Sequence, residues 1–197
     1  SVRLNLPGRH NMLNALAAIA VARELGVEDA AIQRALNAFE GIGRRFCVSE
    51  CALSDHRRFT LIDDYGHHPS ELRATLEAAR GSWPDRRLVL VFQPHRYSRT
   101  QEQFEDFVQV LGDADLLLLC EVYAAGEQPI PGADGRALAR AIRQRGQIEP
   151  VFIEHLDAVA EVLDHLLVDG DLLLLSGAGD IGQLAASLPG ALGGECQ

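Results

Sequence analysis

Small and apolar residues recur at helical spacing in the first part of the chain. Residues 11–26 and 29–39 each place apolar side chains three or four positions apart, which predicts two helices. Gly41 and Gly43 then interrupt the pattern and predict a hinge. The first 43 residues are therefore expected to form a short helical segment that precedes a separate domain.

Beyond the hinge, strand-like and helix-like segments alternate. The strand-like runs are mostly Leu, Val and Ile without polar alternation, which indicates strands buried on both faces. The predicted strands are 46–53, 59–64, 88–92, 116–122, 150–153 and 172–176, and the predicted helices are 70–80, 100–111, 134–145, 156–167 and one from about residue 181. We expect an α/β fold: a Rossmann-like, mostly parallel sheet with helices on both faces. Residues 190–197 are expected to be a loose tail.

The overall composition narrows the class of protein. With 197 residues and 47% hydrophobic content, the chain can bury a sizeable core. A net charge of −10 argues against a nucleic-acid binder, and no apolar run is long enough to span a membrane. The four cysteines, Cys47, Cys51, Cys120 and Cys196, lack paired spacing. They are expected to be free thiols in a reducing compartment, which favours the cytoplasm, and no metal site is predicted.

All 18 basic residues are arginines. A chain without lysine cannot contain the lysine of a phosphate-binding P-loop, and the GxxxxGK[ST] pattern is absent. Any phosphate chemistry that needs this lysine must obtain it from elsewhere.

Two polar segments, residues 63–69 and 93–100, each follow a strand-like run and lead into a helix-like run. In a parallel sheet such loops emerge at the same carboxyl edge, so their side chains converge on one crevice. Carboxylate, imidazole and guanidinium groups together indicate an enzyme site for anionic substrates.

The second of these segments holds the candidate anion-binding group. Arg96 and Arg99 flank the expected start of a helix, where Thr100 and Gln103 fit a capping box. Two guanidinium groups with free backbone N–H groups would bind a carboxylate or a phosphate. The alternative is that these arginines pair with neighbouring acids such as Glu102.

Three other motifs admit more than one interpretation. His67 and His68 are adjacent and should point apart, so hydrogen bonding is favoured over a zinc site, and capping of the next helix remains possible. The GxGxxG pattern at 177–182 follows the last strand rather than the first, which favours a tight turn over a dinucleotide site. Asn11 and Asn14 face the same way and suit a purine edge, although Asn near a helix start is often only a cap.

Four motifs together resemble the Mur ligase family. They are LPGRHNMLN at 6–14, GRRF at 43–46, DDYGHHP at 63–69 and FQPHRYSRT at 92–100. The resemblance covers nearly the whole chain in the right order. The last motif is most similar to that of the members that add L-alanine to UDP-N-acetylmuramate in peptidoglycan precursor synthesis.

The resemblance implies a domain organisation and a reaction. Mur ligases have a UDP-binding domain, a central ATPase domain with a P-loop and a C-terminal Rossmann-like domain. Residues 1–43 would be the helical end of the central domain and 44–197 the C-terminal domain. The chain would then be a fragment, inactive alone, with the P-loop and most Mg²⁺ ligands upstream. The implied reaction forms an amide from UDP-N-acetylmuramate, L-alanine and ATP through an acyl phosphate.

The resemblance also implies roles for individual residues. Those that would bind ATP are His10, Asn11, Asn14, Arg45 and Asp64. Those that would face L-alanine and the new amide are Tyr65, His67, His68, His95, Arg96 and Arg99, with His67, Arg96 and Arg99 as the catalytic groups. Two alternatives remain open: a sister ligase that recycles muramyl peptides, and a non-catalytic dinucleotide-binding module.

Overall fold

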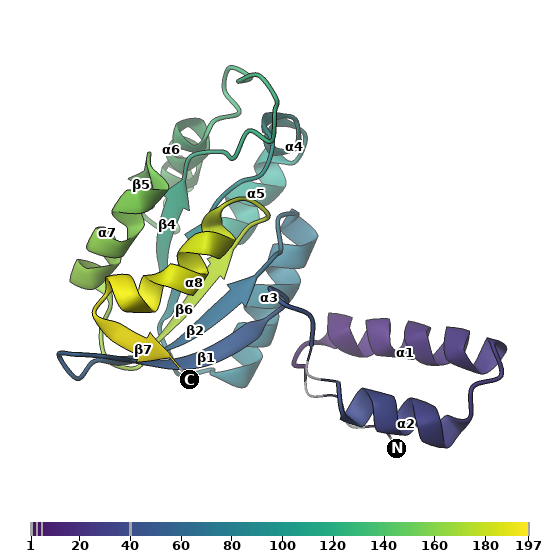
Figure 1. Cartoon of the computed structure of the whole chain (residues 1–197). Coiled ribbons are helices and arrows are strands. Elements are labelled where there is room, and N and C mark those ends of the chain that lie inside the picture. The colour runs from purple at the N-terminus through teal and green to yellow at the C-terminus, as the bar shows by residue number, and fades with distance from the viewer. Residues whose placement is uncertain (1, 3, 5, 40, 197) are drawn as a thin grey trace.

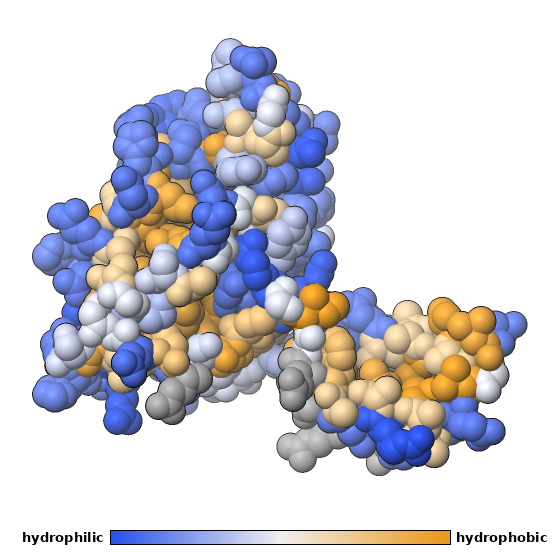
Figure 2. Space-filling view, viewed as in Figure 1, coloured by the Kyte–Doolittle hydropathy of each residue, from blue (hydrophilic) through white to orange (hydrophobic). Residues whose placement is uncertain are grey.

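A computed structural model describes residues 2, 4, 6–39 and 41–196. The chain begins with two helices, α1 (Arg9–Glu24) and α2 (Asp29–Asn37), which confirms the predicted helical pair. The pair projects from the rest of the molecule (Figure 1). No residue of α1 is buried, and Leu25 after it is 76% exposed. Figure 2 accordingly shows apolar side chains over the surface of the pair.

The remainder of the chain folds around one seven-stranded sheet with the order β5-β4-β3-β6-β2-β1-β7. The strands are β1 (Cys47–Leu53), β2 (Arg58–Asp64), β3 (Leu88–Phe92), β4 (Leu116–Cys120), β5 (Val151–Ile153), β6 (Asp171–Ser176) and β7 (Gly194–Cys196). The five strands from β5 to β2 in this order are parallel, whereas β1 is antiparallel to both of its neighbours. The predicted mostly parallel sheet is confirmed.

Helices cover both faces of the sheet, as the unbroken apolar strands predicted. The helices after β2 are α3 (Pro69–Ser82), α4 (Tyr97–Glu102), α5 (Phe104–Leu111), α6 (Gly135–Arg145), α7 (Val159–Leu166) and α8 (Ile181–Ala191), with a short 3-10 turn at Leu156–Ala158. Leu88 and Leu90 of β3 pack with α3, α5 and α6, while Val89 packs with α7 and α8 on the opposite face. Alternate residues of one strand thus belong to two hydrophobic cores, one on each face of the sheet, so both faces of the strand must be apolar.

The predicted helix at 100–111 is two helices in the structure. It breaks at Gln103, and the first piece begins at Tyr97, before the predicted start. Thr100 is fully buried inside α4, and its Oγ1 donates to the carbonyl oxygen of Arg96 at 2.9 Å. The predicted Thr100–Gln103 capping box is therefore wrong.

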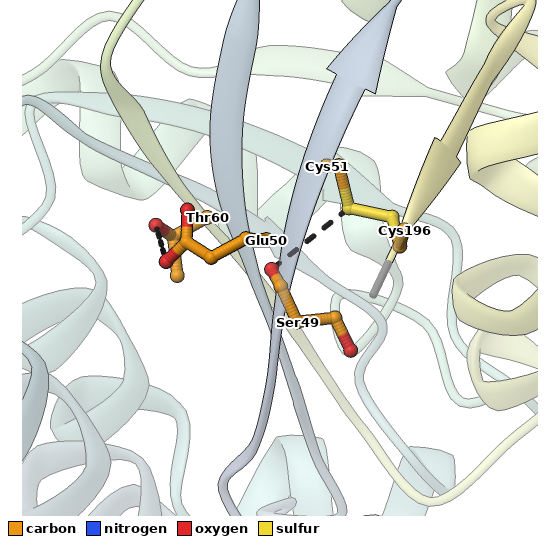
Figure 3. The surroundings of a disulfide bond; sticks show 5 residues. All are labelled: Ser49, Glu50, Cys51, Thr60 and Cys196. Atoms are coloured by element: carbon orange, nitrogen blue, oxygen red, sulfur yellow. Dashed lines mark hydrogen bonds between the residues drawn. A yellow bond between two sulfur atoms is a disulfide. The ribbon is translucent and has the colours of Figure 1, made fainter.

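The C-terminal residues are not a loose tail. Residues 194–196 form β7, which pairs with β1, and Cys196 lies directly opposite Cys51. These two cysteines form a disulfide across a sequence separation of 145 residues (Figure 3). The prediction of four free thiols is wrong for this pair, because a separation so large leaves no spacing signal in the sequence.

The other two cysteines are free, with Cys47 exposed and Cys120 buried. Burial raises the pKa of Cys120 to about 12, which keeps it an unreactive thiol. Among the described residues, no helix is both long enough and apolar enough to cross a bilayer.

Candidate active site

Side chains from three strand ends meet at the carboxyl edge of the sheet, as the sequence predicted for the loops after β2 and β3. The rings of His67 and His95 lie 5.7 Å apart between centroids. Tyr65 meets His67 edge-on at 5.3 Å, and Tyr123, which follows β4, stacks on His95 at 5.5 Å. Four rings therefore form a continuous row over the strand ends.

The two adjacent histidines point to different partners, as expected from their spacing. His67 Nδ1 lies 3.0 Å from the carbonyl oxygen of Tyr65. His68 caps α3: its Nδ1 accepts from the backbone N–H of Ser70, and Glu71 accepts from the N–H of His68 in return. The capping interpretation thus applies to His68, whereas His67 belongs to the row of rings.

Arg99 and His95 form a cluster beside this row. Arg99 Nη1 lies 3.2 Å from His95 Nδ1 and donates to the carbonyl oxygen of His95 at 3.2 Å. Burial, and then the charges of Arg99, His67 and Arg96, lower the pKa of His95 below its usual value. A neutral imidazole can accept from Arg99 at Nδ1 and keep its proton on Nε2. The positive charge of this pair therefore resides on Arg99.

Arg96 has an unusual backbone, with φ 72° and ψ 133°. Such a conformation costs a residue other than glycine about 1–3 kcal/mol, so surrounding contacts must hold it. The N–H of Arg96 donates to the carbonyl oxygen of Tyr123 at 2.8 Å, and the N–H of Tyr123 donates to Pro94 at 2.8 Å. The chain after β4 therefore fixes the loop after β3.

One of the predicted free N–H groups at the start of α4, that of Ser98, is already occupied. Glu127 accepts from the backbone N–H of Ser98 at 3.0 Å and from its hydroxyl at 2.7 Å. The same carboxylate lies 3.7 Å from Arg96, so Glu127, and not the predicted Glu102, is the acid beside this arginine. Sequence reasoning missed Glu127 and Tyr123 because both lie in a loop with no motif of its own.

A second part of the site is a cavity of about 270 Å³ between the helical pair and the start of α3. All five residues proposed from the sequence for ATP line it: His10, Asn11, Asn14, Arg45 and Asp64. Asn11 is not a helix cap, since α1 begins before it, at Arg9. The side-chain amide of Asn11 donates to the carbonyl oxygen of Pro7 at 2.7 Å. Residues far apart in the sequence thus share one cavity.

Asp64 has a structural role within this cavity wall. Asp64 is 7% exposed, and its carboxylate accepts from the N–H groups of Phe46 and Gly66, both at 2.9 Å, and from the hydroxyl of Thr75 at 3.1 Å. These bonds tie the chain before β1, the loop after β2 and α3 together. Asp64 therefore shapes the cavity chiefly through the backbone that it holds.

The GxGxxG turn is filled by the protein's own side chains. A Cβ on Gly179 would lie 2.5 Å from Gln93 Oε1, and one on Gly182 would lie 2.3 Å from the guanidinium of Arg44. Arg44 also donates to the carbonyl oxygen of Gly177 at 2.6 Å. The turn is thus occupied by the protein's own side chains, which supports the tight turn over a dinucleotide site.

The fold and the edge site define a Rossmann-like ligand-binding domain. Comparison with known proteins identifies its class: the family described as "Mur ligase, glutamate ligase domain" matches residues 43–179. The chain belongs to the Mur ligase family.

Individual relatives agree with this assignment. The UDP-N-acetylmuramate–L-alanine ligase of Methylococcus capsulatus is 61% identical over 98% of this chain, and that of Halorhodospira halophila is 62% identical over 98%. The chain spans only 41% and 40% of the length of these two relatives.

Solved structures show the same relationship. The MurC structure from Thermotoga maritima matches with a TM-score of 0.75 and 31% identity, over 95% of this chain and 38% of that one. The murein peptide ligase of Psychrobacter arcticus matches with a TM-score of 0.67 and 25% identity, over 98% of this chain and 38% of that one.

Proposed function

We propose that this chain is the C-terminal part of an ATP-dependent ligase that joins L-alanine to UDP-N-acetylmuramate. The single observation that carries the proposal is the identity of about 60% to ligases of this name over nearly the whole chain. Such a reaction needs one binding site for the nucleotide and one for the amino acid. The 270 Å³ cavity and the arginine–histidine cluster, both at the carboxyl edge of the sheet, can supply these two sites.

The domain boundary is placed between residues 43 and 44. The family match begins at residue 43, six residues after α2 ends at Asn37, which supports this division. Leu13 and Leu16 of α1 are more than half exposed, as is Leu25. We assign this apolar face to packing against the rest of the central ATPase domain, because exposed apolar clusters of this kind mark interfaces.

The nucleotide is assigned to the cavity between the two parts of the chain. The amides of Asn11 and Asn14 offer donors and acceptors to adenine, and Arg45 offers charge to the ribose and phosphate end. The described residues contain no group of three or more His, Cys, Asp or Glu side chains suited to a metal ion. We therefore assign the Mg²⁺ ligands, and the P-loop lysine that this chain lacks, to the rest of the ligase.

The amino acid is assigned to the arginine–histidine cluster. In the proposed reaction, the lactyl carboxylate of UDP-N-acetylmuramate attacks the γ-phosphate of ATP to give an acyl phosphate and ADP. The amine of L-alanine then attacks the acyl carbon and releases phosphate. Arg96 and Arg99 would grip the alanine carboxylate and His67 would face the new amide, so this chain contributes positioning and charge neutralisation.

The test is L-alanine-dependent release of ADP and phosphate. The longer protein should turn over with UDP-N-acetylmuramate, ATP, Mg²⁺ and L-alanine, whereas residues 1–197 alone should release no ADP. A peptide that begins with L-alanine is the matched control, since a ligase that recycles such peptides would prefer it. Preference for the peptide, or turnover by residues 1–197 alone, would contradict the proposal.

A further inference from the structure

The connection between β4 and α6 contains a carboxylate that the proposed mechanism does not yet use. Glu127 lies on this connection, and its side chain is 24% exposed. It reaches Ser98 at the start of α4, which is 29 residues away in the sequence, and accepts two hydrogen bonds from this residue. Hydrogen bonding to the Ser98 backbone is the main cause that lowers the pKa of Glu127, so the group is ionised at neutral pH.

The turn that carries Glu127 has a backbone suited to this reach. Ala125 and Gly126 have positive φ angles of 49° and 85°, and the N–H of Glu127 donates to the carbonyl oxygen of Ala124 at 3.0 Å. The turn therefore folds back and presents the carboxylate to the start of α4. The two hydrogen bonds from Ser98 then hold Glu127 at this position.

Arg96 is held from two sides by the same connection. Its N–H donates to the carbonyl oxygen of Tyr123, and its guanidinium lies 3.7 Å from Glu127. That distance is at the outer limit of an ion pair, and Arg96 makes no shorter contact with an acid among the described residues. Glu127 can therefore restrict the direction of the Arg96 side chain while leaving its N–H donors available.

We propose that Glu127 is a positioning residue that orients Arg96 for the carboxylate of the incoming amino acid. This inference rests on the proposed function, because it assigns Arg96 to that carboxylate. A long arginine side chain loses rotamer freedom when it binds, and an acid that already restricts it lowers this cost. The role predicts a selective effect on binding of the amino acid.

The experiment measures steady-state kinetics of the longer ligase with Glu127→Gln. We expect the KM for L-alanine to rise at least about fivefold, with kcat and the KM for ATP changed less than about twofold. Ser98→Ala loosens Glu127 without removing its charge and should raise the same KM in the same direction. A rise in the KM for ATP as large as that for L-alanine would indicate general loosening and overturn the proposal, as would an unchanged KM for L-alanine in both variants.

A matched control lies at the opposite end of the sheet. Asp115 also accepts from a backbone N–H, that of Leu88 at 2.7 Å, and pairs with Arg80 at 2.8 Å. Asp115→Asn therefore removes the same kind of charge from the same kind of contact, far from the amino-acid cluster. The KM of the Asp115→Asn variant for L-alanine should match that of the unaltered ligase.

A double-mutant cycle tests whether Glu127 acts through Arg96. In an Arg96→Lys background, Glu127→Gln should add less than about twofold to the KM for L-alanine, because the oriented group is already changed. Full additivity would show that Glu127 acts independently and would overturn the role. If the unaltered ligase shows no L-alanine-dependent turnover, the proposed function fails; if it turns over and the cycle is additive, only this inference fails.

Discussion

Breaking the disulfide between Cys51 and Cys196 should lower the free energy of unfolding of this chain by about 2–5 kcal/mol. The bond closes a loop with a sequence separation of 145 residues. The chain-entropy relation for a loop of that length gives about 5 kcal/mol at room temperature. This figure is an upper limit, because β7 has only three residues and can detach locally once the bond is broken.

Equilibrium urea unfolding with and without dithiothreitol measures this difference. Cys196→Ser should lose a similar free energy and become insensitive to the reductant. Cys47→Ser is the matched control, since it removes an exposed free thiol from the same sheet and should stay sensitive.

A count of reactive thiols checks the reasoning independently. The denatured protein should expose two thiols before reduction and four afterwards, since Cys47 and Cys120 are free. Four thiols before reduction would refute the disulfide. An unfolding free energy that the reductant changes by less than about 1 kcal/mol would refute the estimate of its contribution.

Two further predictions concern the site and the domain boundary. In the longer ligase, Arg96→Lys and Arg99→Lys should each lower kcat/KM for L-alanine at least about tenfold, because an ammonium cannot replace a bidentate guanidinium. A tenfold loss corresponds to about 1.4 kcal/mol of transition-state stabilisation. Wild-type kinetics together with a lower melting temperature would instead assign these two arginines a structural role. Limited proteolysis of the chain should cut at residues 41–43 before it cuts within the sheet. Equal protection of residues 41–43 and of the sheet would contradict the prediction of a hinge.

Strand and helix identity followed from local pattern. Leu88–Phe92 is buried at every position and was predicted with its observed bounds, because a strand covered on both faces needs apolar residues throughout. The start of α4 was missed because its cap comes from Glu127, 29 residues away, and no local residue signals it. β7 was missed because three residues carry no periodicity, and its pairing with β1 depends on a partner far along the chain.

In the candidate site, too, some features follow from the local sequence and others depend on contacts between distant parts of the chain. The sequence by itself determined which residue types follow the strand ends. The strand order then placed the ring centroids of His67 and His95 5.7 Å apart. The tertiary structure alone decided that Tyr123 stacks on His95, that Glu127 accepts from the N–H of Ser98, and that Cys51 meets Cys196. Periodicity records how a residue relates to its neighbours within a few positions, whereas contacts across 29 or 145 residues depend on sheet order and register.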